Sequence, residues 1–172
     1  TGVAHALKVQ GNDHTRVVVI AGDGATYDIG FGALSGMFDR REDVIYVCYD
    51  NELYANTGVQ KSGATPYGAA TTTTAEGKVH HGNEAEKKPV VEIAAAHGIP
   101  YAASASIAFI ADLKLKIKKA KETRGPSFIT VSAPCCLGQG FDGGITMNVA
   151  RLTVQARLWN LFEITDGKYK LS

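Results

Sequence analysis

The sequence predicts an α/β protein with an open, mostly parallel sheet and helices on both faces. Three observations support this class. Residues 16–21 and 44–48 are continuous apolar runs without polar alternation, which is typical of strands covered on both faces of a parallel sheet. A glycine-rich turn and a helical segment join these two runs, as in a βαβ unit. Residues 127–131 form a third apolar run of the same kind.

Composition limits the classes of protein to which the chain can belong. Its 172 residues are 45% hydrophobic, so we expect one domain spanning residues 1–172. Lys and Arg number 18 against 17 for Asp and Glu, and this net charge of +1 gives no electrostatic case for a nucleic-acid or membrane partner. No apolar run is long enough to cross a membrane, and the chain opens without a signal-peptide pattern. The three cysteines form no disulfide framework. We therefore expect a cytoplasmic protein.

The first half of the chain is expected to fold around the first strand. A helix over residues 1–9 precedes it, and the turn Gly22-Asp23-Gly24 ends it. The helix after this turn has apolar residues available for a buried face: Ile29, Phe31, Leu34 and Phe38. After the second strand, residues 52–88 show no periodicity. Because loops this long inside compact domains are usually functional or disordered, we interpret this segment as an active-site loop.

The second half continues the alternation of helix and strand. A helix over residues 89–97 leads to a small-residue strand at 101–106, and an amphipathic helix follows over 107–122. Five lysines of that helix are predicted to face outward: Lys114, Lys116, Lys118, Lys119 and Lys121. They could form a docking patch, but a solvated helix face is the favoured interpretation. After the third apolar run come a glycine-rich loop at 133–146 and a last helix at about 148–160.

Two polar side chains are predicted to meet at one edge of the sheet. Asp23 follows the first strand and Asn51 follows the second, and ligands of open parallel sheets bind outside the carboxyl ends of the strands. A carboxylate and an amide oxygen form part of a shell for Mg²⁺, which commonly completes its coordination with water and substrate phosphates. Asp23 could instead only cap the following helix. The residues alone favour capping.

A family resemblance shifts this balance. The segments GDGATYDIGFGALSG and DNELYANTGVQKSGATPYGA resemble the thiamine diphosphate-binding domain or beta subunit of the 2-oxoacid:ferredoxin oxidoreductases, the pyruvate:ferredoxin enzymes (pyruvate synthases) above all. The likeness continues through AAAHGIPYAASAS, KKAKETRGPSFITVSAPC and ARLTVQARLWNLFEI, and so covers most of the chain. It implies the diphosphate-domain fold of thiamine diphosphate enzymes. It also implies that the sequence begins partway through a longer protein.

The resemblance assigns roles to particular residues. It implies that Asp23 and Asn51 bind Mg²⁺ through their side chains and Leu53 through its backbone carbonyl. It places Asn56 near the reacting carbons, as a hydrogen-bond donor to substrate or intermediate, although Asn56 could be a simple turn residue. The remaining residues that it assigns to cofactor binding are Gly22, Gly24, Ala25, Thr26 and Thr57.

The cysteines divide into one candidate ligand and two structural residues. Cys135, in the motif SAPC, matches the position of one ligand to a 4Fe-4S cluster, whose other ligands the resemblance places outside this chain. An ordinary loop thiol is the alternative. Family members usually continue PCP, whereas this chain has Pro134-Cys135-Cys136, so we interpret Cys136 as structural or incidental. Cys48, within an apolar strand, is expected to be a buried small hydrophobe.

The activity that the resemblance implies is the reversible oxidative decarboxylation of pyruvate. Coenzyme A would accept the acetyl group, CO₂ would leave, and electrons would pass through iron–sulfur clusters to ferredoxin. The pyrimidine ring of the cofactor would belong to an alpha-type partner, and further partners would be gamma- and delta-type subunits. This chain would be inactive without them.

Three alternatives stay open from the sequence. The enzyme could act on 2-oxoglutarate, on a branched-chain or aryl 2-oxoacid, or on oxalate. The chain could also be a noncatalytic assembly module that binds partner subunits through its long loop. A Rossmann dinucleotide binder is the weakest alternative, because Gly22-x-Gly24 lacks the third glycine of that motif.

Overall fold

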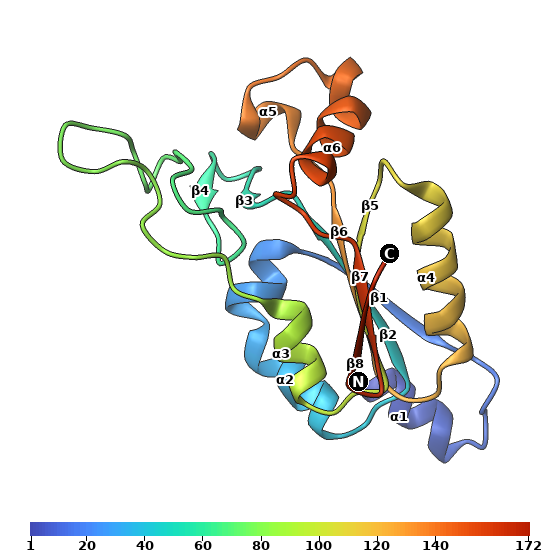
Figure 1. The fold of residues 1–172 in the computed structure, drawn as a ribbon. Coiled ribbons are helices and arrows are strands. Elements are labelled where there is room, and N and C mark those ends of the chain that lie inside the picture. The colour runs from blue at the N-terminus through green and yellow to red at the C-terminus, as the bar shows by residue number, and fades with distance from the viewer.

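A six-stranded sheet forms the centre of the molecule (Figure 1). The computed structural model describes residues 1–172. The strands are β1 (Val17–Gly22), β2 (Val44–Asp50), β5 (Tyr101–Ser106), β6 (Ser127–Ser132), β7 (Phe162–Thr165) and β8 (Lys168–Leu171), in the spatial order β1-β2-β6-β5-β7-β8. The first four strands of this order are parallel to one another, and β7 and β8 add an antiparallel hairpin at the far edge. The prediction of an open, mostly parallel sheet is confirmed.

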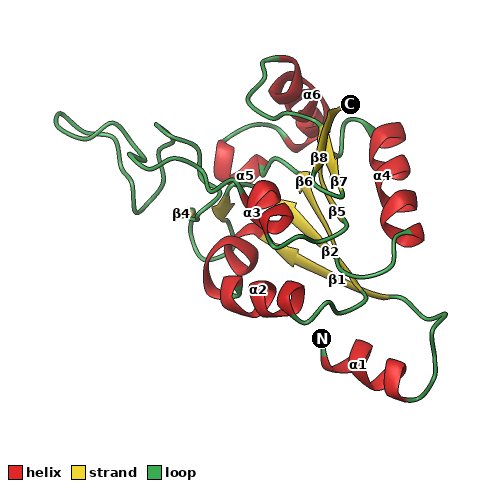
Figure 2. Ribbon diagram, turned by 60° about the horizontal axis from the view of Figure 1, so that its bottom comes forward, coloured by secondary structure: helices red, strands yellow, loops and turns green.

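Helices cover both faces of the sheet (Figures 1 and 2). On one face lie α2 (Phe31–Asp39) and α3 (Val90–Ala96), and on the other lies α4 (Ile110–Glu122). The helix α1 (Gly2–Val9) lies near the amino ends of the strands, whereas α5 (Cys136–Gln139) and α6 (Thr146–Gln155) lie beyond their carboxyl ends (Figure 1). None of these helices combines the length and apolar character needed to cross a bilayer.

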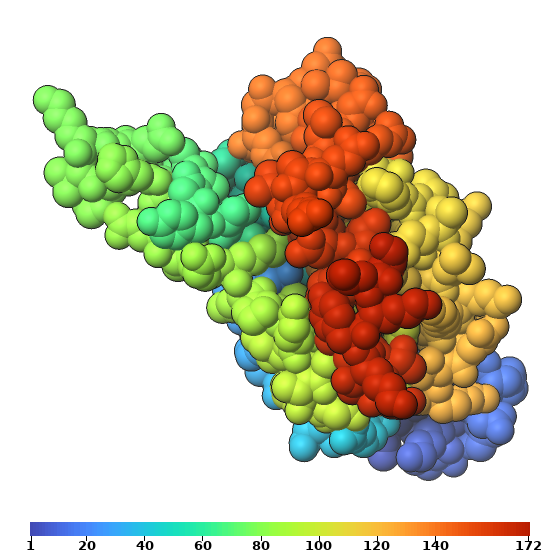
Figure 3. Space-filling view, viewed as in Figure 1, coloured from blue at the N-terminus to red at the C-terminus, as the bar shows by residue number.

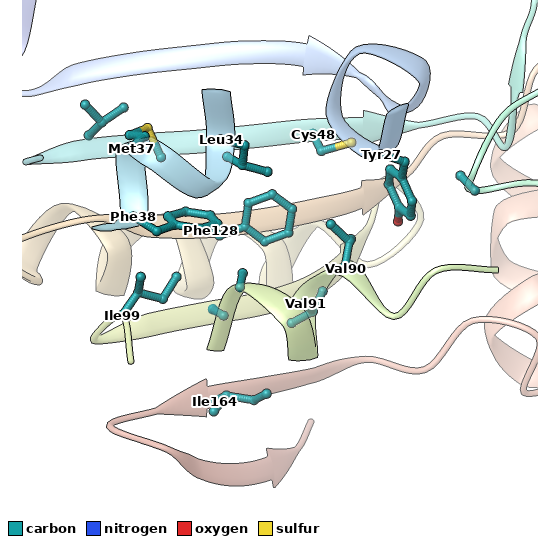
Figure 4. Packing of buried hydrophobic residues seen from close by; sticks show 14 of the residues in the cluster. Tyr27, Leu34, Met37, Phe38, Cys48, Val90, Val91, Ile99, Phe128 and Ile164 are labelled. Atoms are coloured by element: carbon teal, nitrogen blue, oxygen red, sulfur yellow. The ribbon is translucent and has the colours of Figure 1, made fainter. Parts of the chain in front are cut away.

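The larger core lies between the sheet and the helices α2 and α3. Phe128 of β6 is at its centre and meets the edge of Phe38 at 6.0 Å between ring centroids (Figure 4). Phe128 also stacks on Tyr46 at 5.8 Å between ring centroids. Leu34 of α2, which the sequence pattern predicts on a buried face, packs in the same cluster, and so does Met37 of the same helix. Cys48 is fully buried here, which confirms its assignment as a core residue.

The interpretation of the first strand as covered on both faces is wrong. Val17 and Val19 pack against the larger core, but Val18 is half exposed and Ile20 is 71% exposed. The strand order explains this difference, because β1 is an edge strand and α4 packs on β5 and β6 rather than on β1. A continuous apolar run shows that a strand belongs to the sheet, but it does not show how far the covering helices extend.

Two side chains lie opposite to their predicted directions. Ile29 was expected on a buried face but is 84% exposed, because residues 24–29 form a π-helical turn that changes the phase of the apolar positions before α2 begins. Lys116 was expected to face outward but is only 2% exposed. Its ammonium group donates to the carbonyl of Ser104 and pairs with Asp112, both at 2.7 Å, so the charge is compensated within the fold.

The two glycine-rich segments contain short elements that the sequence pattern does not predict. In the long loop, β3 (Leu53–Tyr54) and β4 (Gln60–Lys61) form a small hairpin, and the rest of the loop extends away from the body of the molecule (Figures 1 and 3). The segment predicted as a loop at 133–146 contains α5 and the 3₁₀ turn Gly143–Ile145. The last helix ends at Gln155, earlier than the predicted 160.

Candidate functional site

The candidate site lies where β1 and β2 end. The two strands are parallel, and their register pairs Gly22 with Tyr49. Asp23 therefore leaves the end of β1 beside the end of β2, where Asp50 and Asn51 follow. The structure brings Asp23 and Asn51 to the same edge of the sheet on adjacent strands, as the sequence predicts.

Asp23 has a buried carboxyl group. The residue is 2% exposed, and Ser62 of the long loop donates a hydrogen bond to its Oδ2. Burial raises the pKa of Asp23 to about 6, and the neighbouring Asp50 carboxylate adds to that increase. A buried carboxylate whose ionised form is this poorly compensated is suited to a cation as its partner.

The β2–β3 turn, residues 50–53, provides the second part of the site. Asn51 Oδ1 accepts the backbone N–H of Leu53 at 3.3 Å, and Asp50 Oδ1 accepts the backbone N–H of Glu52 at 2.9 Å. Glu52 has a φ of +71°, a left-handed conformation that non-glycine residues seldom adopt. Such a conformation persists where the surrounding contacts determine it, and these are common at functional sites.

The donor set fits a hard divalent cation. It combines the Asp23 carboxylate, the Asn51 amide oxygen and the Leu53 carbonyl, all of them oxygen ligands of the kind that Mg²⁺ prefers. The raised pKa of Asp23 supports the fit, because a bound cation would favour the ionised form that burial alone opposes.

The glycine turn and the π-helix after it hold the next predicted residues. Gly24, Ala25 and Thr26 open the π-helix Gly24–Ile29. Thr26 is buried, and its hydroxyl group donates to the carbonyl of Gly22 at 2.7 Å, so this side chain locks the turn. The ring of Tyr54 lies against Gly24, where an added Cβ would come within 2.1 Å of it. Gly24 is therefore required by a protein contact as well as by any ligand.

The remaining predicted cofactor residues lie on the β3–β4 hairpin. Asn56 and Thr57 are exposed in its turn, and Thr57 donates a hydrogen bond to Gln60. The hairpin begins at Leu53, so its turn lies on the same side of the molecule as the β2–β3 turn. They remain accessible to a ligand or to another subunit.

Cys135 lies beyond the carboxyl end of β6. It is the N-cap residue of α5, and its sulfur accepts the backbone N–H of Gly138 at 3.3 Å. Both Cys135 and Cys136 are half-buried free thiols. No group of three or more His, Cys, Asp or Glu side chains in this chain could hold a metal. A 4Fe-4S cluster is held by four ligands, so a cluster bound at Cys135 would need its other ligands from elsewhere.

Sequence reasoning missed Lys87, whose side chain is 25% exposed and lies against the β2–β3 turn. Lys87 Nζ lies 3.0 Å from Asp50 Oδ2 and 3.1 Å from Glu52 Oε1, and 4.3 Å from the centroid of the Trp159 ring. Tyr27 donates to the same Asp50 carboxylate at 2.7 Å. The only signal in the sequence is the pair of lysines at the end of the long loop, and spacing alone does not connect it with Asp50.

The family comparison identifies the class of protein. Residues 1–131 match the family described as thiamine pyrophosphate enzyme, C-terminal TPP binding domain. The chain belongs to this family of thiamine diphosphate-binding domains, and the predicted fold and family are confirmed together.

Comparison with individual proteins gives more specific similarities than the family match. Pyruvate synthase subunit PorB of Methanothermobacter thermautotrophicus is 49% identical over all 172 residues of this chain, which cover 60% of PorB. Ketoisovalerate oxidoreductase subunit VorB of Pyrococcus abyssi is 50% identical over 98% of this chain and 54% of VorB. A solved 2-oxoglutarate:ferredoxin oxidoreductase from Magnetococcus marinus, with 2-oxoglutarate, coenzyme A and succinyl-CoA bound, aligns with a TM-score of 0.70 at 28% identity, over 87% of this chain and 48% of that one. The chain thus spans about half the length of these proteins.

Proposed function

We propose that this chain binds the diphosphate and Mg²⁺ of thiamine diphosphate in a 2-oxoacid:ferredoxin oxidoreductase. The observation that carries the proposal is Asp23, a buried carboxylate at the end of β1 that lies beside the oxygen-rich β2–β3 turn. It occupies this position in a chain about half identical to the PorB and VorB subunits.

Different residues of the site bind the metal ion and the diphosphate. Asp23, Asn51 and the carbonyl of Leu53 hold the metal ion. The backbone amides of Gly24, Ala25 and Thr26 face the diphosphate, since the first amides of a helical segment have no intrahelical acceptor and favour anions. Gly22 lets the chain turn closely under this group.

The β3–β4 hairpin and the Cys135 thiol act near the reacting carbons of the cofactor. Asn56 donates a hydrogen bond near the reacting carbons, where a donor is most effective as negative charge develops, and Thr57 contributes to cofactor binding. When bound, thiamine diphosphate supplies the carbon that attacks the 2-oxoacid and stabilises the charge left by decarboxylation. Cys135 would supply one thiolate ligand to a 4Fe-4S cluster, and such a cluster would accept the electrons. The three free cysteines agree with a cytoplasmic, reducing environment.

Partner subunits complete the enzyme. We infer an alpha-type subunit that holds the pyrimidine ring, together with gamma- and delta-type subunits, and ferredoxin and coenzyme A as further reactants. The names PorB and VorB support a multi-subunit assembly, and a chain that holds only the diphosphate end is inactive by itself.

Pyruvate is the substrate that we propose. A branched-chain 2-oxoacid is the second candidate, because VorB of Pyrococcus abyssi is as similar to this chain as PorB is. The native assembly containing this chain, supplied with coenzyme A and ferredoxin, should oxidise pyruvate faster than 2-oxoisovalerate, and the chain alone should oxidise neither.

The Asp23→Ala assembly is the control for this experiment. We expect it to lose turnover with every 2-oxoacid. A preference for 2-oxoisovalerate would replace pyruvate by the second candidate. Turnover retained in the Asp23→Ala assembly would contradict the proposed site and favour a noncatalytic assembly module, and turnover by the chain alone would contradict the requirement for partners.

A further inference from the structure

Lys87 joins the two ends of the long loop beneath the candidate metal ligands. The loop begins at Glu52 and ends at Lys88. The ammonium group of Lys87 lies 3.1 Å from the Glu52 carboxylate and 3.0 Å from the carboxylate of Asp50, which has no exposed side-chain surface. Its third side faces the ring of Trp159 at 4.3 Å. Two carboxylates and an aromatic ring thus contact the ammonium group, while a quarter of the Lys87 side chain stays exposed.

The two carboxylates that Lys87 contacts flank Asn51. Asp50 Oδ1 holds the turn by accepting the N–H of Glu52, and Tyr27 donates to Asp50 Oδ2, the oxygen that Lys87 also contacts. Glu52 is held in its left-handed conformation by this bond, by Thr65, which donates to its carbonyl at 2.6 Å, and by Lys87 at its side chain. Removal of Lys87 therefore frees one anchor on each side of Asn51.

We propose that Lys87 is a positioning residue for the Mg²⁺ site. Through Asp50 and Glu52 it fixes the β2–β3 turn in the form that directs Asn51 Oδ1 and the Leu53 carbonyl toward the metal bound by Asp23. Lys87 lies next to Lys88 at the end of the long loop. Docking of the loop against the sheet and positioning of the metal ligands therefore occur together. This inference rests on the proposed function, since it assigns Lys87 a role toward the proposed metal ion.

The test measures binding rather than turnover. The native assembly is stripped of cofactor and incubated with thiamine diphosphate at a series of Mg²⁺ concentrations, and the retained thiamine diphosphate is quantified after gel filtration. We expect Lys87→Met to raise the Mg²⁺ concentration for half-maximal retention by about 10-fold or more, because loss of a residue that orients metal ligands typically weakens metal binding by that amount. Lys87→Arg, which keeps the charge, should restore part of the loss.

Lys118→Met is the matched control. Lys118 is an exposed lysine of α4 paired with Glu122 at 3.9 Å, so the same substitution there should leave retention unchanged. Glu52→Ala removes only one of the two contacts and should weaken Mg²⁺ binding less than Lys87→Met. In the double variant the losses should not multiply, because both residues act through the same turn.

The outcomes separate the two proposals. If the unmodified assembly shows no Mg²⁺-dependent retention, the proposed function fails. If it does, and Lys87→Met binds Mg²⁺ within twofold of it, the positioning role is wrong while the proposed function stands. A purely structural role for Lys87 predicts lower thermal stability with unchanged Mg²⁺ affinity in the folded variant. If Lys87→Met does not fold, Glu52→Ala decides: at least threefold weaker binding supports the inference, and unchanged binding contradicts it.

Discussion

The carboxyl group of Asp23 links the sequence motif to the chemistry of the site. A glycine on each side lets the chain turn at the end of β1, and the turn buries the carboxylate between the sheet and Ser62 of the long loop. Without a cation this burial is unfavourable for the ionised form, as the raised pKa of about 6 shows. The ionised form of Asp23, which is the form suited to metal binding, thus lowers the stability of the metal-free fold.

Replacing Asp23 by Asn should stabilise the metal-free chain above pH 6. A carboxyl group whose pKa is higher in the folded state stabilises the fold when protonated. This contribution is present below the unfolded value of 3.8 and is lost as the pH rises through about 6. Asparagine resembles the protonated form, so the variant should gain roughly 2–3 kcal/mol at pH 8 and less than about 1 kcal/mol at pH 4. Urea unfolding in EDTA at both pH values measures this difference, and an equal effect at both would contradict the assignment.

The residue scale also shows what sequence reasoning could and could not find. Asp23 and Asn51 follow apolar strands, so the rule for parallel sheets places them at one edge without any coordinates. Lys87 and Asp50 are 37 positions apart along the chain and are joined through an aperiodic loop. No spacing rule predicts that contact, because it depends on how the loop returns to the sheet.

At the scale of elements, the turn from β1 into the π-helix is built around the contact between Gly24 and Tyr54. The Tyr54 hydroxyl donates to the Gly24 carbonyl at 3.0 Å and to Asp28 at 3.2 Å. The β3–β4 hairpin, which carries Tyr54, is therefore fixed on the π-helix. This contact joins Gly24, one of the residues proposed to bind the diphosphate, to the hairpin that carries Asn56.

Replacing Gly24 by Ala should displace the hairpin. A Cβ there would come within 2.1 Å of the Tyr54 ring, so we expect a loss of about 1–3 kcal/mol in the free energy of unfolding. Gly32→Ala in α2 is the matched control, since a Cβ at Gly32 has no neighbour within 4 Å and alanine favours a helix by roughly 0.5–1 kcal/mol. Urea unfolding of both variants compares them. Equal stability of the two would contradict the packing described for Tyr54.

Element types were more predictable than their surroundings. Apolar runs identified β1, β2 and β6, and helical periodicity identified α2 and α4. The exposed face of β1 depends on strand order, and the burial of Lys116 depends on Asp112, one turn earlier in α4, and on the Ser104 carbonyl of β5. These two errors concern what packs on an element, whereas the error at Ile29 comes from the π-helix, an element type that the sequence pattern did not predict.

At the scale of the whole molecule, the site lies at the carboxyl edge of the sheet with its upper side formed by loops. The long loop projects from the body of the molecule, and α5 with the cysteine pair lies beside α6 beyond the same edge (Figures 1 and 3). Asn56, Thr57, Cys135 and Cys136 therefore lie on the same side of the fold as Asp23. This arrangement agrees with a cofactor shared between this chain and a partner.

The most direct test of the central claim is the thiamine diphosphate and magnesium content of the native assembly, purified without oxygen. The assembly carrying Asp23→Ala is purified in parallel. We predict that both components are present in stoichiometric amounts in the parent and are lost together in the variant. An intact parent assembly that contains neither would contradict the account, and the match to this family would then reflect a shared fold without the cofactor.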